Sequence, residues 1–142
     1  MDVPVLVLLG FAAWTLLTLF GTIGVYRWSR ILTGRTGIAH WRADEQQGGE
    51  WYRRAIRAHM NCVENLPIYT ALVVALIATG LHSSTIDHLA IAILAARVGQ
   101  TLAPILLPPT NAAASLRFAF FFAQAACMIA IGLIIIFHGS GT

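Results

Sequence analysis

The sequence has 142 residues, of which 58% are hydrophobic and 11% charged, and its mean hydropathy is +0.74. Ordinary soluble domains carry about 25% charged residues, and a soluble chain of this size has too much surface relative to its volume to bury so many apolar side chains. We therefore exclude a soluble protein and predict an integral membrane protein. The formal net charge is +3 and all basic residues are arginines. Because they are not spread over a soluble face, we expect no nucleic-acid partner.

The first predicted span, residues 3–26, is an uncharged apolar run that is long enough to cross about 30 Å of hydrocarbon as a helix. It is too long for the core of a cleavable signal peptide and no Lys or Arg precedes it, so we expect it to be retained. Further apolar stretches predict spans at about 55–79, 85–106 and 112–138. The sequence thus predicts a single all-α domain over residues 1–142, an integral membrane four-helix bundle.

The polar segment after the first span is rich in arginine, with Arg27, Arg30, Arg35, Arg42, Arg53 and Arg54. The connection between the second and third spans has no Lys or Arg, and neither does either terminus. The positive-inside bias therefore predicts that the first loop is cytoplasmic and that both termini lie outside. Arginine without lysine in an alanine-rich chain is typical of GC-rich bacterial genomes, so we expect a multi-pass protein of a bacterial inner (plasma) membrane.

Charged side chains inside the predicted spans are the first candidates for a site, because charge within a bilayer usually faces a cavity or a partner. They are Arg57 and Glu64 in the second span, Arg97 in the third and Arg117 in the fourth. A helix rises about 1.5 Å per residue, so Arg57 lies about 3 Å and Arg117 about 8 Å from the cytoplasmic ends of their spans. Glu64 and Arg97 each lie about 14 Å from the cytoplasmic end. All four fall in the cytoplasmic half. The alternative is that Glu64 pairs with one arginine while the others extend to the interface.

Neutral polar residues share the faces of these charges. Asn61 lies on the same helical stripe as Arg57 and Glu64, which Arg54 extends by a turn, and Gln100 shares a face with the third-span arginine. More arginines than carboxylates leave an excess of positive charge, which is unfavourable in a low-dielectric site without an anionic ligand. Guanidinium, amide and carboxylate groups together suit a small zwitterion with more than one carboxylate.

The stretch from Arg54 to Pro67, RAIRAHMNCVENLP, resembles the signature of the MAPEG family, the membrane-associated proteins in eicosanoid and glutathione metabolism. The match is Arg-Ala-His-x-Asn-x-x-Glu-Asn-x-Pro at the start of a second span after an arginine-rich loop, and the length and four-span plan also fit. The resemblance implies a homotrimer that binds glutathione, as co-substrate, at the cytoplasmic side between neighbouring subunits. It also implies a glutathione transferase or peroxidase that acts on lipophilic electrophiles.

By position, the resemblance implies that glutathione is bound by Arg57, Asn61, Glu64, Arg97, Gln100 and Arg27. Arg117, near the start of the fourth span, matches the arginine that activates the thiol in several members, so it is the candidate catalytic residue. Only the thiolate is a good nucleophile, and a free thiol has a pKa of about 8.5. We expect the electrophile to arrive from the lipid against Phe120 and Phe121. Several members have a histidine or tyrosine where this chain has Gln100, and a tyrosine where it has Pro104.

Two other functions remain open at the level of the sequence. A non-catalytic lipid-binding protein of the same fold would bind a lipophile without ionising glutathione. A small four-span transporter would use Glu64 as a proton-coupled carboxylate and would need neither Arg57 nor Arg117. Cys62 and Cys127 lie in apolar stretches without C-x-x-C spacing, so we expect neither a metal site nor a disulfide.

Overall fold

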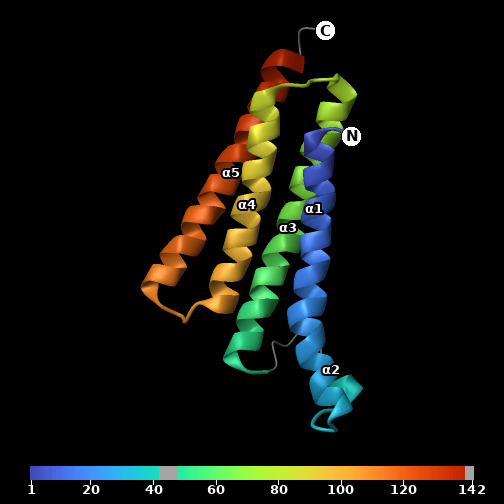
Figure 1. Cartoon of the computed structure of the whole chain (residues 1–142), viewed down its shortest axis with the longest axis vertical. Helices are drawn as coiled ribbons and strands as arrows, with labels where there is room; N and C mark the ends of the chain where they lie inside the picture. Colours follow the sequence, from blue (N-terminus) through green and yellow to red (C-terminus); the bar gives the residue numbers. More distant parts are fainter. Residues whose placement is uncertain (42–47, 140–142) are drawn as a thin grey trace.

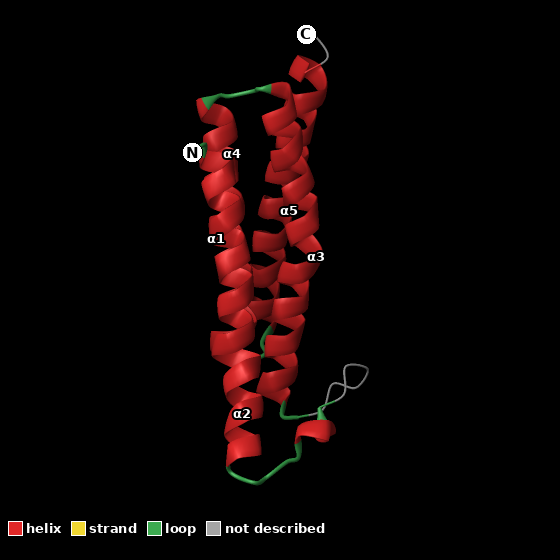
Figure 2. Cartoon of the chain, turned by 90° about the vertical axis from the view of Figure 1, so that its right-hand side faces the viewer, coloured by secondary structure: helices red, strands yellow, loops and turns green. Residues whose placement is uncertain are grey.

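The computed structural model describes residues 1–41 and 48–139, and all the regular elements in these ranges are helical, which confirms the predicted all-α class (Figure 2). Arg42 of the first loop lies outside the described residues. The elements are α1 (Val3–Thr18), the π-helix η1 (Leu19–Gly24), α2 (Val25–Leu32), the 3-10 helix η2 (Ile38–His40), α3 (Glu50–Thr79), α4 (Ser84–Leu106) and α5 (Asn111–Gly139).

Four helical stretches are long and apolar enough to cross a membrane, as predicted: Val3–Leu32, Glu50–Thr79, Ser84–Leu106 and Asn111–His138. The first combines α1, η1 and α2 without a break. This first stretch and α3 both extend beyond the apolar runs into the arginine-rich segment. Tyr52, in the extension of α3, is buried and stacks on Tyr26 of α2 with 4.4 Å between ring centroids. This aromatic contact holds the two extensions together.

The helices run side by side along the long axis of the molecule (Figure 1). The N-terminus, the 80–83 connection and the end of α5 lie at one end, and α2 and the 107–110 connection lie at the other. The buried core includes Phe11 of α1, Tyr69 of α3, Ile93 of α4 and Ile131 of α5. The Tyr69 hydroxyl donates a hydrogen bond of 3.1 Å to the carbonyl of Pro4. This bond fixes the start of α1 against the middle of α3.

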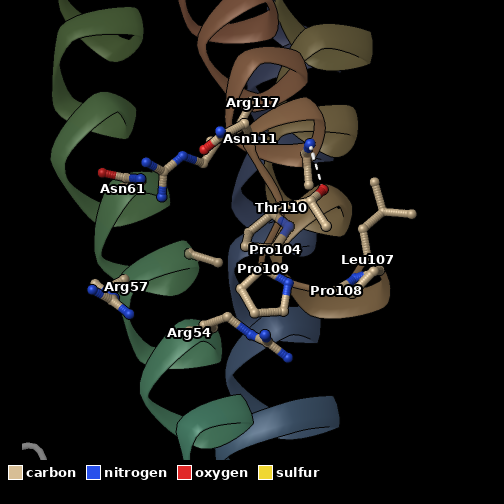
Figure 3. Close-up of a pocket in the computed structure, with 13 residues that line it drawn as sticks. Arg54, Arg57, Asn61, Pro104, Leu107, Pro108, Pro109, Thr110, Asn111 and Arg117 are labelled. Carbon is tan, nitrogen blue, oxygen red and sulfur yellow. Dashed lines mark hydrogen bonds between the residues drawn. The ribbon is translucent and has the colours of Figure 1, made fainter.

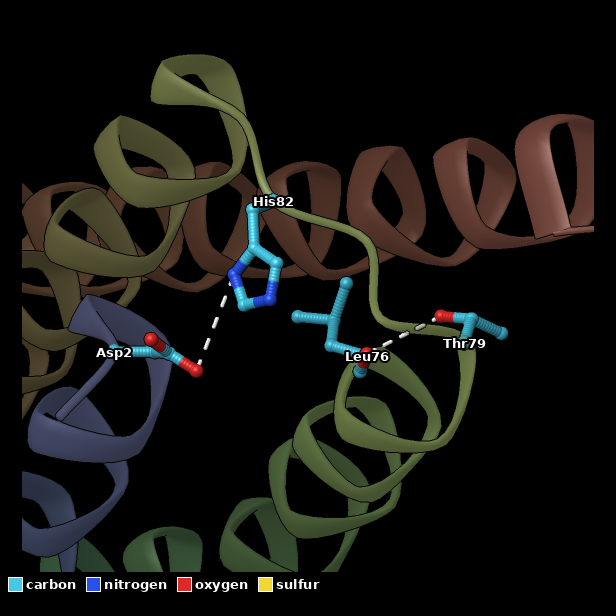
Figure 4. Close-up of polar contacts among 4 residues, drawn as sticks. All are labelled: Asp2, Leu76, Thr79 and His82. Atoms are coloured by element: carbon cyan, nitrogen blue, oxygen red, sulfur yellow. Dashed lines mark hydrogen bonds and ion pairs between the residues drawn. The ribbon is translucent and has the colours of Figure 1, made fainter.

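A glycine and a serine stabilise the turn between α3 and α4, because the first ends α3 and the second caps α4. Gly80 ends α3 with φ +63°, a left-handed conformation that glycine adopts without strain. Ser83 precedes α4, and its Oγ accepts a 3.2 Å hydrogen bond from the Ile86 N–H. Asp2 reaches this turn, where its carboxylate lies 3.9 Å from Nδ1 of His82 (Figure 4). The N-terminus therefore lies against the turn.

Prolines shape the opposite end of α4. Pro104 lies inside this helix, where it cannot donate the usual hydrogen bond to the carbonyl of Gln100. The helix continues to Leu106, and the connection that follows contains Pro108 and Pro109. This proline-rich connection leads directly into α5, so α4 and α5 are antiparallel neighbours.

Candidate functional site

Two neighbouring cavities, which share lining residues, lie between α3 and α5. The inner cavity, of about 490 Å³, is lined by Arg57, Met60, Asn61, Glu64, Gln100, Arg117, Phe118 and Phe121. The outer cavity, of about 300 Å³, is nearer the 107–110 connection and is lined by Arg54, Arg57, Ala58, Asn61, Pro104, Leu107, Pro108, Pro109, Thr110, Asn111, Ala113, Ala114 and Arg117. Arg57, Asn61 and Arg117 line both cavities. The structure thus brings five of the seven predicted site residues together.

Three of these residues come from a single stripe of α3. Arg57, Asn61 and Glu64 follow the i, i+4, i+7 spacing, so successive turns of the helix present them to the same side. Arg117 reaches the stripe from α5, and its guanidinium extends toward Asn61 (Figure 3). The side chain also passes over Phe118, whose ring centroid is 5.2 Å from the guanidinium carbon. Both walls of the inner cavity therefore carry positive charge.

The inner cavity also offers hydrogen-bond acceptors. Gln100 of α4 is only 5% exposed, and its Oε1 is buried with no hydrogen-bond partner among the described residues. Glu64 is exposed and has no ion-pair partner in that part of the chain. An unpaired carboxylate and an unpaired amide oxygen can accept hydrogen bonds from an ammonium or amide group. Together with Arg57 and Arg117, these acceptors are chemically complementary to a small zwitterion with an excess of negative charge.

Arg97 does not reach the cavities, although it shares a face of α4 with Gln100. Residues three apart on a helix are rotated by about 60° from each other, and Arg97 is the one that lies beside Phe11 of α1. Its side chain is completely buried, and its guanidinium carbon lies 5.4 Å from the ring centroid of Phe11. Within residues 1–41 and 48–139, none of its three side-chain nitrogens has a hydrogen-bond partner. In the single chain Arg97 lines neither cavity.

Arg27 belongs to an aromatic cluster at the α2 end of the bundle, outside both cavities. Its Nε donates a 2.5 Å hydrogen bond to the Tyr52 hydroxyl, and its guanidinium carbon lies 5.5 Å from the centroid of the Trp41 ring. Tyr26 stacks on Tyr52 in the same cluster. The structure therefore separates Arg27 from the residues that line the inner cavity.

The aromatic lining differs in part from the sequence-based expectation. Phe121 lines the inner cavity, but the place expected for Phe120 is taken by Phe118. Phe120 instead packs against Gly99 of α4. Both Phe118 and Phe121 are exposed, so the inner cavity has an apolar wall that is accessible from outside the bundle.

Sequence reasoning did not identify the start of α5 as part of the site. Thr110 precedes the helix, its Oγ1 accepts a 3.2 Å hydrogen bond from the Ala113 N–H, and both Thr110 and Asn111 line the outer cavity (Figure 3). A threonine after two prolines and before an apolar helix is a recognisable capping signal. No cluster of three or more His, Cys, Asp or Glu side chains in the described ranges is placed to hold a metal ion.

Comparison with known proteins identifies a family. No curated protein matches the chain, and no solved structure does so either. The sequence model of the MAPEG family matches residues 5–137, a range that contains the residues lining both cavities. The match covers nearly the whole of the 142-residue chain and agrees with four helices able to cross a membrane. The chain therefore belongs to the MAPEG family of integral membrane proteins.

Proposed function

We propose that this MAPEG protein is a membrane-bound glutathione transferase or peroxidase that conjugates or reduces lipophilic electrophiles with a glutathione thiolate. The observation that carries the proposal is the composition of the inner cavity, whose lining combines Arg57 and Arg117 with Asn61, Glu64 and Gln100. Glutathione has two carboxylates, one ammonium and two peptide groups. The inner cavity has a complementary side chain for one carboxylate, for the ammonium and for each peptide group, and Arg117 is left for the thiolate.

In this proposal each polar residue binds a different group of the tripeptide. The guanidinium of Arg57 forms paired hydrogen bonds with a carboxylate, and the carboxylate of Glu64 accepts from the ammonium. Asn61 binds a peptide group, and the buried Oε1 of Gln100 accepts from a ligand N–H. An unpartnered buried acceptor costs free energy that such a bond recovers.

Arg117 has the catalytic role, because it brings a positive charge to the cavity from the opposite helix. The thiol loses its proton to solvent, and the guanidinium stabilises the resulting thiolate. Each unit by which the pKa of the thiol falls requires about 1.36 kcal/mol of preferential interaction with the anion. In the transferase reaction the thiolate sulfur forms a bond with the electrophilic carbon, and the leaving group departs with the displaced electron pair. Phe118 and Phe121 provide the apolar wall for the electrophile.

The assembly and location of the protein form part of the same proposal. We propose a homotrimer in a bacterial inner membrane, with glutathione bound at the cytoplasmic side between neighbouring subunits. Arg97 and Arg27, which lie outside the cavities of the single chain, remain predicted glutathione ligands in that assembly. Membership of the MAPEG family supports these proposals.

The test is the thiolate difference absorbance of glutathione mixed with detergent-purified protein at neutral pH. We expect a signal from the wild type that Arg117→Ala abolishes and Arg57→Ala reduces in part. Arg35→Ala is the matched control, because Arg35 is an exposed arginine outside both cavities. The control should keep the full signal.

Two results would contradict this function. A wild type without signal at millimolar glutathione would exclude thiol activation and, if lipid binding persisted, would favour the non-catalytic lipid-binding protein. An equal loss in Arg35→Ala and Arg117→Ala would show that the signal reflects net charge and does not require the cavity. Flux of a substrate into proteoliposomes that Glu64→Gln abolishes would instead support a transporter.

A further inference from the structure

The outer cavity is strongly cationic and is not needed to explain binding in the inner cavity. Three arginines line it, Arg54, Arg57 and Arg117, and no acidic residue of the described ranges does so. The Nε of Arg54 is buried and has no hydrogen-bond partner among the residues that the structure describes. A buried guanidinium N–H without a hydrogen-bond partner is unfavourable. The cavity is therefore suited to an anion.

The start of α5 adds hydrogen-bond donors to this charge. Thr110, Asn111, Ala113 and Ala114 line the cavity, so the first turn of a 29-residue helix faces it. The Ala113 N–H is already bonded to the Thr110 hydroxyl oxygen, but the N–H groups before it have no carbonyl partner within the helix, and together with the helix dipole they favour anions. The arginines and these N–H groups lie on different elements. They can therefore contact different oxygens of a phosphate that has three free oxygens.

The position of the cavity indicates where such an anion comes from. Trp51, at the same end of α3, is 37% exposed and its Nε1 donates a 3.1 Å hydrogen bond to the carbonyl of Ile105. Exposed tryptophans are enriched at the boundary between the membrane and water, where lipid phosphates also lie. Arg54 is about 15 Å along α3 from Glu64, so apolar Met60, Phe118 and Phe121 lie deeper, where an acyl chain would be.

We propose that the outer cavity binds a phosphate group at the membrane boundary, carried by an anionic lipid or free in solution. Arg54, Arg57, Arg117 and the first turn of α5 hold the phosphate oxygens. Arg57, Asn61 and Arg117 also line the inner cavity, so the phosphate and the inner-cavity ligand share side chains. The phosphate proposal overlaps the proposed glutathione site in these side chains, but it does not require the proposed function.

The test is isothermal titration calorimetry of the detergent-purified full chain with lysophosphatidate, lysophosphatidylcholine of the same acyl chain, and inorganic phosphate, all without glutathione. The lysophosphatidate head group is a phosphate monoester, whereas lysophosphatidylcholine has the same tail and no net charge. The wild type should bind lysophosphatidate about tenfold more tightly or better, because charged hydrogen bonds favour it. Arg54→Gln should reduce this ratio toward unity, and the exposed-arginine control Arg35→Gln should keep it.

A second variant separates binding from folding. Asn111→Asp introduces a negative charge into the cavity at a helix N-terminus, where an acidic residue favours the helix. It should therefore weaken lysophosphatidate binding about tenfold without lowering the thermal unfolding temperature, and leave the affinity for lysophosphatidylcholine unchanged. Binding of inorganic phosphate as tight as that of lysophosphatidate would identify free phosphate as the source and support the site.

Two results would overturn the proposal. The first is equal affinity of the wild type for the two lipids. The second is a preference for lysophosphatidate that both Arg54→Gln and Asn111→Asp preserve. Because the lipid titrations contain no glutathione and the thiolate measurement contains no lipid phosphate, either proposal can fail while the other holds.

Discussion

Arg97 and Arg117 carry the same charge in different surroundings. Arg117 lines both cavities, whereas Arg97 is completely buried beside Phe11. The contact with the aromatic ring offsets only part of the cost of burying a charge, because cation–π contacts are worth about 0.5–2 kcal/mol and the loss of hydration costs several kcal/mol. The two arginines should therefore respond differently to replacement by an apolar side chain.

We expect Arg97→Met to raise the free energy of unfolding by about 1–4 kcal/mol, since methionine fills similar space without a buried charge. The measurement is unfolding by SDS in mixed micelles, followed by far-ultraviolet circular dichroism. Arg35→Met is the control and should change the free energy little, because Arg35 is exposed. A lower stability of Arg97→Met would show that the guanidinium has a strong partner in the assembled protein.

The residues of the candidate site were predictable where their placement depends on one helix alone. Arg57, Asn61 and Glu64 share a stripe of α3 because of helical periodicity, and the inner cavity contains all three. The separation of Arg97 from Gln100 depends on how α4 is rotated against α1 and α5, which packing decides. Thr110 reaches the site only through the path of the connection before α5. Placements of this kind require the tertiary structure.

At the scale of the elements, the contact between α4 and α5 depends on a glycine. A Cβ atom added at Gly99 would lie 2.6 Å from Cζ of Phe120, whereas one added at Gly132 of α5 would meet only Leu72 Cδ2 at 3.7 Å. The first distance is far below van der Waals contact and the second is an ordinary contact. Gly99 therefore lets the Phe120 ring lie directly on the backbone of α4.

We predict that Gly99→Ala is less stable than Gly132→Ala by about 1–3 kcal/mol, the usual cost of overpacking. Both variants gain the same helix propensity from alanine, so their difference isolates the contact. The free energies come from the same SDS titration. Phe120→Leu should recover part of the loss in the Gly99→Ala background, and additive effects of the two substitutions would exclude a direct contact.

The helices themselves were predictable from apolar runs, because a chain in hydrocarbon must satisfy its backbone hydrogen bonds internally. The positions at which α2 ends and α3 begins, at the arginine-rich side, were not predictable in this way. α3 begins at Glu50 and α2 ends at Leu32, beyond the predicted spans, since Tyr52 and Tyr26 stack and extend both helices. The π-helix Leu19–Gly24 also has no signal in the apolar pattern, because the widening of one turn leaves the composition unchanged.

At the scale of the whole molecule, all the identified cavity-lining arginines lie toward the end of the bundle that carries α2 and the 107–110 connection (Figure 1). The arginine-rich first loop also leaves the bundle at this end. The positive-inside bias predicts that this end is cytoplasmic. Glutathione and phosphate would then reach the two cavities from the cytoplasm, and both termini would lie on the opposite side of the membrane.

Reporter fusions expressed in a bacterial host test this orientation. Alkaline phosphatase, which is active only outside the cytoplasm, should be active when fused after Gly139 and inactive when fused after Pro109. A green fluorescent protein, which fluoresces only if it folds in the cytoplasm, should give the opposite pattern at the same sites. Reversed patterns would place the cavities on the outer side of the membrane. A cytoplasmic co-substrate could not then reach Arg57 and Arg117, so the orientation decides whether the proposed chemistry has access to its thiol.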